Sequence, residues 1–593
     1  MISKRKTDYA KGAMERVSRT AMGIVRRSPV YKWRFGGTHG DQLLIVPQDL
    51  RTVDPSFATE LRHGLFGLAG AVAELREASP FDIAPPNAIW QRDLLGFSWL
   101  RHMAGDDDDE TRELARQLTV KFIDRHKAQK GLAWDPVIVS RRLISWLAHA
   151  RLILHEASQK EYEAILRSLN RMLRHLAIGY GDAIDGEPRL RALTGLIYGG
   201  LCIAEQDQFA EEFVAPFSDE LERQILEDGG HISRHPGTTI ELILDLLPLK
   251  QCFVARDRKP PLALDRAIRR ALPMLRYMRL GDGLISRFNG MTATWPDRLA
   301  TVLAYDDLQI DPLVDAPQSC YSRLQRRRTV LIADVGSPPP LALSCSAHAG
   351  CLSFEMSVDQ HPVIVNCGAP GPADQDWRAV GRSTAAHSTM TINDKSSSQL
   401  VQRPQLENQL GAPPISGPDR VEARVGSGDD GSALIRAFHD GYVERFGMVH
   451  ERSLRLGPHG DVLEGVDKLT RSRQVRTVRS AQSLIFALHF HIHPRVDVKR
   501  TAKENIIELE LANGEKWQLV VADGIIRLEE SVFLAEFAGP LEAVQAVVRG
   551  SCGETTEIRW RLEQSQSATL DALQVRRRRF AVIEGSRSDD AED

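Results

Sequence analysis

The stretch Leu343-Ser-Cys-Ser-Ala-His-Ala-Gly-Cys-Leu-Ser-Phe-Glu355 decides the fold, together with Pro362-Val-Ile-Val-Asn-Cys-Gly368 and Arg382-Ser-Thr-Ala-Ala-His-Ser-Thr-Met-Thr-Ile-Asn393. These are three short β-type runs joined by turns. Each run carries a group that can bind a metal or a proton: His348 in the first, Asn366 or Cys367 in the second, and His387 in the third. Because neighbouring antiparallel strands lie about 5 Å apart, we expect these groups to converge on one point.

The C-terminal half of the chain has the pattern of an antiparallel β-sandwich. Short β-type runs alternate with turn residues, as at Gly457-Pro-His-Gly460 and Asn513-Gly514. We therefore expect residues 326–584 to form a sandwich domain, and the acidic, Ser-rich tail at 585–593 to be disordered. The first expected strands are 328–334, 340–346, 352–357, 363–366 and 388–392.

The N-terminal half has a helical pattern, because apolar residues recur there at a spacing of three to four. The expected helices are 57–77, 110–126, 136–154, 161–180, 190–206, 211–227 and 238–254. Helical hairpins repeated over this length form either a solenoid or a closed toroid. Since the sequence shows no strict period, we expect a toroid over residues 46–325 and a multidomain α+β chain overall.

Bulk properties restrict the partners and the compartment. The net charge of −3 over 593 residues argues against nucleic acid as a partner. The seven cysteines are odd in number and form no CxxC pair, which argues against a disulfide framework and favours a reducing compartment. We therefore expect a cytoplasmic protein.

Residues 1–45 form a basic arm. Its first 29 residues contain no continuous apolar block, so we expect no secretory signal, and no later segment is long enough to span a bilayer. The arm is expected to pack on the first domain or to fray in water. The alternative is that it lies on an anionic membrane surface.

One loop in the helical half has the features of an anion site. In Asp228-Gly-Gly-His-Ile-Ser-Arg-His-Pro236, glycines flank His231, Arg234 and His235, and Pro236 opens the next helix. A guanidinium and imidazoles at a helix N-terminus can cradle an anion, since free backbone N–H groups point the same way. The alternative is a capping loop with exposed histidines.

Two further groups of polar residues fit more than one interpretation. The stretch from Tyr277 to Asn289 places Arg287 at a turn, where a structural and a functional role are equally compatible with the sequence. In His489-Phe-His-Ile-His493, strand alternation puts all three imidazoles on one face. This pattern favours an exposed polar face over a metal site.

Taken in order, the motifs resemble those of the heparinase II/III family of polysaccharide lyases. The resemblance rests on Phe97-Ser-Trp-Leu-Arg101, Trp134-Asp-Pro136, Arg191-Ala-Leu-Thr-Gly-Leu196, Gly229-Gly-His-Ile-Ser-Arg-His-Pro236, His348-Ala-Gly-Cys-Leu-Ser-Phe-Glu355, Ser383-Thr-Ala-Ala-His-Ser-Thr389, Asp440-Gly-Tyr442 and Phe490-His-Ile-His-Pro494. It implies an incomplete α/α toroid followed by an antiparallel β-sandwich, with the cleft between them. It also implies β-elimination on a uronate-containing acidic polysaccharide or oligosaccharide, and it makes a periplasmic location the alternative to a cytoplasmic one.

Elimination at a uronate requires a group that neutralises the carboxylate, a base and an acid. The candidate catalytic residues are His235, Arg234, Tyr277 and Ser346, the last of which stands where the family places a histidine. The candidate substrate-binding residues are His231, Arg287, Asn289 and Arg382. The family resemblance further implies one divalent metal, zinc or similar, held by His348, Asn366 and His387, with Asn366 at the position of the family's aspartate.

Two other functions remain open from the sequence. The family places a catalytic tyrosine near Thr238, and the absence of a tyrosine there, like the serine at Ser346, favours a non-catalytic protein on the same scaffold. Such a protein would bind carbohydrate or assemble the cell envelope. A third interpretation is a cytoplasmic enzyme that processes glycan fragments. The sequence does not predict an oligomeric state.

Overall fold

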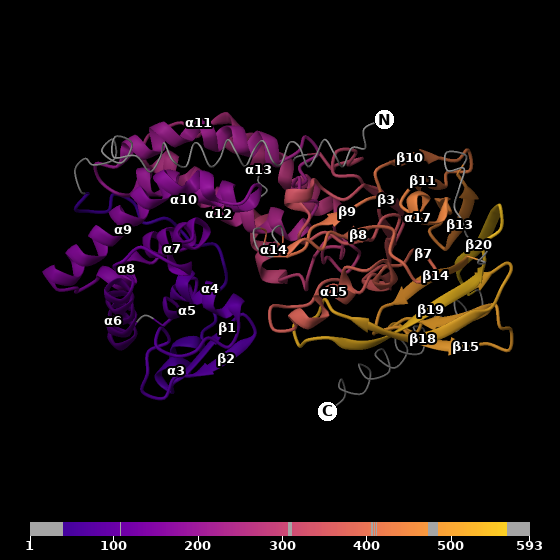
Figure 1. Cartoon of the computed structure of the whole chain (residues 1–593), viewed down its shortest axis with the longest axis horizontal. Helices are drawn as coiled ribbons and strands as arrows, with labels where there is room; N and C mark the ends of the chain where they lie inside the picture. The colour runs from indigo at the N-terminus through magenta and orange to yellow at the C-terminus, as the bar shows by residue number, and fades with distance from the viewer. Residues whose placement is uncertain are drawn as a thin grey trace, which may run out of the picture.

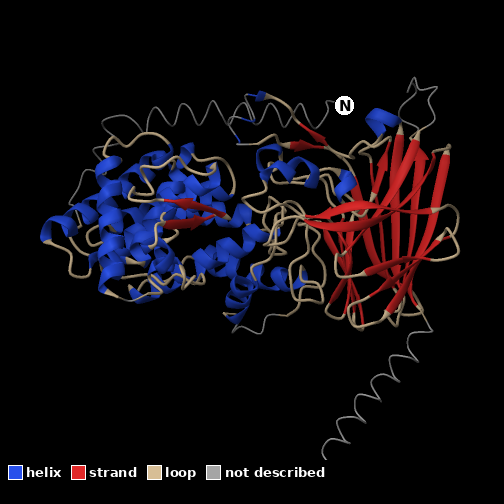
Figure 2. Ribbon diagram, turned by 90° about the horizontal axis from the view of Figure 1, so that it is seen from below, coloured by secondary structure: helices blue, strands red, loops and turns tan. Residues whose placement is uncertain are grey.

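The computed structural model describes residues 40–565, apart from residues 107, 306–310, 405, 406, 408, 409, 411 and 473–483. Most of the predicted basic arm and the whole predicted acidic tail lie outside the described residues. A helical domain and a β-sandwich lie side by side (Figures 1 and 2), which confirms the predicted fold class. None of the described helices combines the length and the apolar character needed to cross a membrane.

The helical domain is built from helices with well-defined ends. Its main helices are α4 (Ala88–Gly96), α6 (Asp109–Arg125), α7 (Pro136–Ala148), α8 (Ala150–Leu154), α9 (Gln159–Gly179), α10 (Glu187–Cys202), α11 (Asp207–Gln224), α12 (Pro236–Ala255), α13 (Leu262–Tyr277) and α14 (Pro296–Ala304). Ser158 and Glu161 form a capping box at the start of α9, and Asp135 caps α7 ahead of Pro136. Most of the predicted helices are therefore found within a few residues of their expected ends.

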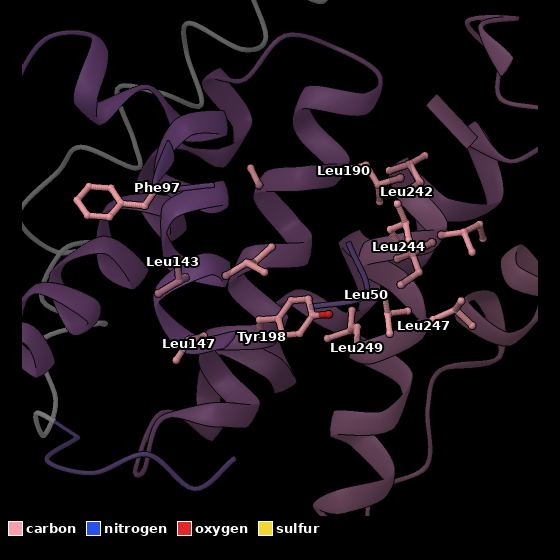
Figure 3. Packing of buried hydrophobic residues seen from close by; sticks show 14 of the residues in the cluster. Leu50, Phe97, Leu143, Leu147, Leu190, Tyr198, Leu242, Leu244, Leu247 and Leu249 are labelled. Atoms are coloured by element: carbon pink, nitrogen blue, oxygen red, sulfur yellow. The ribbon is translucent and has the colours of Figure 1, made fainter. Parts of the chain in front are cut away.

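The core of the helical domain lies between α7, α10 and α12 (Figure 3). Leu143, Leu190 and Leu244 from these three helices are all at most 1% exposed. The hydroxyl of Tyr198 on α10 donates to the carbonyl of Asp245 on α12 at 2.6 Å, which satisfies the one polar atom of this buried side chain.

The predicted helix at 57–77 is wrong. The chain forms only the short helix α3 (Phe57–Arg62), followed by a hairpin of β1 (Leu65–Leu68) and β2 (Ala71–Glu74). Gly64 has φ +76° and Gly70 has φ +72°, and neither value fits an α-helix. A Cβ placed on Gly70 would lie 3.2 Å from Cβ of Ala373, so the hairpin tip meets a loop of the sandwich.

The sandwich consists of two antiparallel eight-stranded sheets. One contains β3 (Tyr321–Arg326), β4 (Thr329–Asp334), β5 (Phe354–Val358), β6 (His361–Val365), β7 (Met390–Ile392), β14 (Ile485–Ile492), β18 (Ile526–Phe533) and β19 (Leu541–Ser551). The other contains β10 (Val421–Ser427), β11 (Ala433–His439), β12 (Met448–Leu456), β13 (Val462–Arg471), β15 (Asp497–Arg500), β16 (Ile506–Glu510), β17 (Lys516–Val521) and β20 (Thr555–Gln564). Phe354 and Trp560 stack between the two sheets with ring centroids 5.7 Å apart. The first sheet begins at Tyr321, slightly before the expected boundary at residue 326.

The predicted strand at 340–346 is also wrong. Pro338, Pro339 and Pro340 lack the N–H groups that a ladder needs, and a single 3₁₀ turn at Leu341–Leu343 follows them. His348 therefore lies in a loop rather than on a strand. Asn366 directly follows β6, and His387 lies between a 3₁₀ turn and β7.

Candidate functional site

Of the three polar residues predicted in the loop before α12, His231 is a core histidine. Its Nδ1 pairs with the Ser233 hydroxyl at 2.7 Å, and its Nε2 pairs with the side-chain carbonyl of Gln224 at 3.0 Å. Burial lowers the pKa of His231 to about 3. Both ring nitrogens are thus used inside the protein, and we correct its predicted role in binding substrate.

Arg234 joins the two domains. Its guanidinium donates to the carbonyls of Ser319 at 2.9 Å, Ser337 at 2.9 Å and Cys320 at 3.1 Å, and it forms an ion pair with Asp334 at the end of β4. The side chain is buried. Because its hydrogen bonds go to protein groups, Arg234 does not fit the predicted role of binding or protonating a ligand.

Tyr277 and Asn289 also serve this junction. The Tyr277 hydroxyl donates to the Tyr321 carbonyl at 3.2 Å, and burial raises the pKa of this phenol. The Asn289 amide donates to the Tyr321 hydroxyl at 2.8 Å and to Asp334 at 3.1 Å, and its oxygen accepts from the His348 backbone at 3.3 Å. Asn289 thus positions the His348 loop, while Tyr277 is committed to the main chain of β3.

The two other predicted arginines are structural as well. Arg287 lies 3.4 Å from the carboxylate of Glu355 and stacks 5.0 Å over the ring of Phe533. Arg382 donates to the carbonyls of Ala347 at 2.9 Å and Ser344 at 3.1 Å, and to that of Pro413 at 2.8 Å. Arg382 therefore shapes the loop that carries Ser346 and His348, instead of facing a ligand.

His235 and Ser346 do approach each other from the two domains. Gly290 separates them: a Cβ added to Gly290 would lie 3.2 Å from Cδ2 of His235 and 3.0 Å from Cβ of Ser346. Both residues are partly exposed, and Nδ1 of His235 makes no hydrogen bond of normal geometry within the described residues. Burial lowers the pKa of His235 to about 4, although nearby carbonyls oppose the shift. His235 is therefore a neutral imidazole at pH 7, and its unpaired Nδ1 is itself buried.

The structure also brings His348 and His387 together. Nδ1 of His348 lies 3.2 Å from Nε2 of His387, whose Nδ1 lies 2.7 Å from the Ser383 carbonyl. The carbonyl fixes the proton on Nδ1 of His387, so His348 must donate to the Nε2 lone pair. Burial lowers the pKa of both imidazoles, that of His387 to about 4.

Asn366 is fully buried and is hydrogen-bonded to Ser388, the residue that follows His387. Its side-chain oxygen accepts from the backbone N–H of Ser388 at 3.0 Å. Its amide nitrogen makes no hydrogen bond within the described residues. Across the described ranges, no three His, Cys, Asp or Glu side chains are grouped so that they could hold a metal ion.

The loops that carry these residues rest on a buried charge network in the sandwich. Arg452 donates to the carbonyls of Leu352 at 2.6 Å and Ser388 at 2.8 Å, and to the carboxylate of Asp467 at 2.8 Å. Asp467 also accepts from His450 at 2.8 Å and from the Trp560 indole at 2.9 Å. The sandwich interior thus fixes the positions of both histidine loops.

His489 and His491 on β14 and His493 directly after it are buried, so the predicted exposed face is wrong. His489 lies 2.9 Å from the Gln545 side chain, and His491 lies 2.8 Å from both the Ser531 hydroxyl and the Ala385 carbonyl. His493 packs against Phe533 with ring centroids 5.2 Å apart. Loops and edge residues cover this side of the sheet, which strand alternation alone does not reveal.

Sequence reasoning missed a cluster of arginines in the helical domain. Arg51 pairs with Asp245 at 2.9 Å, Arg141 pairs with the same carboxylate at 2.8 Å, and Arg298 pairs with Glu241 at 2.8 Å. Arg101 has no ion-pair partner among the described residues, and its Nε is buried without a hydrogen bond. Burial, together with repulsion from neighbouring arginines, lowers the pKa of Arg101 to about 10, although attraction by the Asp49 carboxylate opposes the shift. A half-buried cation of this kind is under-neutralised and favours an anionic ligand.

The fold and the junction site define a protein built on the scaffold of polysaccharide lyases. The model for "Heparinase II/III-like, C-terminal" matches residues 310–561. FtsZ-localized protein C of Caulobacter vibrioides is 30% identical over 540 residues, which cover 88% of this chain and 90% of that protein. The chain belongs to the heparinase II/III-like family.

Solved structures agree with this assignment at the level of the fold. Heparinase III superposes with a TM-score of 0.68 at 13% identity, covering 94% of this chain and 91% of its own. The heparan sulfate lyase HepC from Pedobacter heparinus gives a TM-score of 0.56 at 13% identity, covering 90% and 87%. Identities this low establish the toroid and sandwich architecture alone.

Proposed function

We propose that the chain binds an acidic polysaccharide at the junction of its two domains and does not cleave it. The proposal rests on one observation: Arg234, Tyr277 and Arg382 donate their hydrogen bonds to carbonyl groups of the protein itself. Elimination needs a neutraliser, a base and an acid. Arg234, Tyr277 and Arg382 were candidates for binding the carboxylate or transferring a proton, and their polar groups are hydrogen-bonded within the protein.

The anionic nature of the ligand is supported by Arg101. Among the described residues this guanidinium forms no ion pair, and although Asp49 attracts it, Arg51, Arg141 and Arg298 repel it. A carboxylate or sulfate of a glycan would supply the missing charge. Heparan sulfate, after which the lyase HepC is named, is a polymer of this chemical class.

A role at the sites occupied by FtsZ is supported by the relative that is named for its localisation with FtsZ. The similarity to that protein extends over both domains of this chain. We therefore propose that the chain uses a lyase scaffold to bind its ligand without cleaving it, and that it does so during assembly of the cell envelope.

Cleavage by elimination is the second candidate function. It is favoured by His235, a partly exposed imidazole that is neutral at pH 7 and lies beside Ser346. In that case His235 takes the C5 proton of a uronate, the C4–C5 double bond forms as the C4–O bond breaks, and the departing oxygen takes a proton from water.

The test uses the full chain with a panel of uronate polymers that includes heparan sulfate. Binding is measured by affinity electrophoresis, and unsaturated uronate is measured by its ultraviolet absorbance. We expect binding without new absorbance. Arg101→Gln should weaken binding about tenfold, since a charge-assisted hydrogen bond is worth about 1.5–3 kcal/mol.

The matched control is Arg559→Gln, which removes one arginine whose side chain is 72% exposed on the sandwich. It should leave binding unchanged. Absorbance that rises with wild type and disappears with His235→Ala would establish the lyase instead. Binding to none of the polymers would refute both candidates. A fluorescent fusion that fails to follow FtsZ in the native cell would refute the proposed location.

A further inference from the structure

The metal implied by the family resemblance does not fit the residues present, and the misfit lies at one position. His348 and His387 are spaced suitably. Their facing nitrogens are 3.2 Å apart. Two nitrogens bound to one tetrahedral zinc at about 2.0–2.1 Å lie roughly 3.4 Å from each other. The bond from Nδ1 of His387 to the Ser383 carbonyl is also the outer contact that a metal-binding histidine makes.

Asn366 is the residue that does not fit. Its oxygen, the one atom of the side chain able to bind a cation, accepts the N–H of Ser388 at 3.0 Å. Turning the amide over would set its NH₂ group against that N–H, so the hydrogen bond fixes the orientation. The NH₂ group that remains is buried, makes no hydrogen bond within the described residues, and is a donor that cannot bind a cation.

The neighbouring carboxylates cannot take its place. Asp334 accepts from Arg234 and from the Asn289 amide through its two oxygens. Glu355 accepts the backbone N–H of Asn366 at 2.9 Å through one oxygen and that of Arg287 at 3.0 Å through the other. Among the described residues, neither acid is grouped with His348 and His387 so that the three could hold a metal ion.

We infer that this chain has lost the family's metal site through the single amide at Asn366, and that Asn366→Asp restores it. Aspartate has nearly the shape of asparagine. One of its oxygens can keep the bond to Ser388, while the other occupies the place of the NH₂ group. With His348 and His387, that carboxylate would complete the ligand set implied by the family resemblance, which binds zinc and leaves a fourth position open.

The experiment compares zinc in full-length wild type and Asn366→Asp after loading and removal of excess metal. Metal content is measured by mass spectrometry, and cobalt substitution reports the ligand geometry through its visible spectrum. We expect roughly one zinc per chain in Asn366→Asp and none above background in wild type. Asn513→Asp, which adds a carboxylate at an exposed hairpin turn, is the matched control and should bind none. Adding His387→Ala to Asn366→Asp should abolish binding.

Either of two results overturns the inference. One is a wild-type protein that holds stoichiometric zinc and loses it in His387→Ala, because Asn366 would then not exclude the ion. The other is a folded Asn366→Asp that takes up no zinc or cobalt. If Asn366→Asp does not fold by itself, refolding with zinc decides: recovery of the folded protein supports the inference, and failure counts against it.

Discussion

Arg234 and Asp334 form a buried ion pair across the boundary between the helical domain and the sandwich. Their side chains are 6% and 3% exposed. Arg234 comes from the loop before α12, and Asp334 ends β4. The pair, with the three carbonyls that Arg234 also binds, fixes how the two domains meet.

Arg234→Met should strongly destabilise the protein, because it leaves the Asp334 carboxylate buried without its counter-charge. Removing one partner of a buried pair costs about 3–5 kcal/mol. The free energy of unfolding, measured with urea, checks this value. Arg559→Gln, an exposed arginine on β20, should change it by less than about 0.5 kcal/mol. An unaltered stability in Arg234→Met would contradict the role assigned to the pair.

Acid should unfold the protein well above the pH at which carboxylates titrate. Burial lowers the pKa of His231, His491 and His493 to about 3 and that of His387 to about 4. Below pH 6.5 the unfolded chain binds protons that these folded imidazoles do not, so unfolding becomes more favourable as the pH falls. Each imidazole contributes about 1.4 kcal/mol per pH unit in this window.

Urea unfolding at a series of pH values between about 7 and 4.5 measures this effect. His231→Gln should lower the proton uptake on unfolding by about one. A stability that stays level across this range would show that the buried histidines are already charged in the folded protein.

Gly290→Ala should disturb both the fold and ligand binding. Gly290 has φ +92°, and a Cβ there would lie 2.8 Å from the Ser346 carbonyl oxygen. The left-handed backbone alone costs an alanine about 1–2 kcal/mol. Thermal unfolding and polysaccharide binding are the two measurements. Gly371→Ala is the control, because nothing lies within 4 Å of its Cβ position. If Gly290→Ala and Gly371→Ala had the same thermal stability and the same polysaccharide binding, Gly290 would have no role in the site.

The sequence predicted most of the helices because their signals are local. Asp135 and Ser158 are caps whose partners lie within three residues, and an apolar spacing of three to four needs no knowledge of the fold. The β1–β2 hairpin was missed because the same apolar spacing continues through Gly64 and Gly70. Their positive φ values break the helix. The sequence does not give these values, so it does not show whether a glycine forms a turn or lies within a helix.

The site was predictable by residue type but not by partner. We expected His348 and His387 to converge from neighbouring strands, and the structure does bring them together, although both lie outside the strands. Arg234 donates to the carbonyls of Ser319 and Ser337, which lie close to it only in the folded two-domain protein. Its structural role was therefore not predictable from the sequence. Arg101 ends the motif Phe97–Arg101, but nothing in the sequence shows that it would form no ion pair in the folded protein.

Arg234 and His235 are consecutive residues, and they serve opposite purposes. The first is paired with Asp334 of the sandwich, while the second lies beside Gly290 at the junction. A single peptide unit therefore transmits any displacement of one domain directly to the imidazole at the junction. A change in the angle between the two domains would therefore also move His235, so the geometry of the junction depends on how the domains are docked.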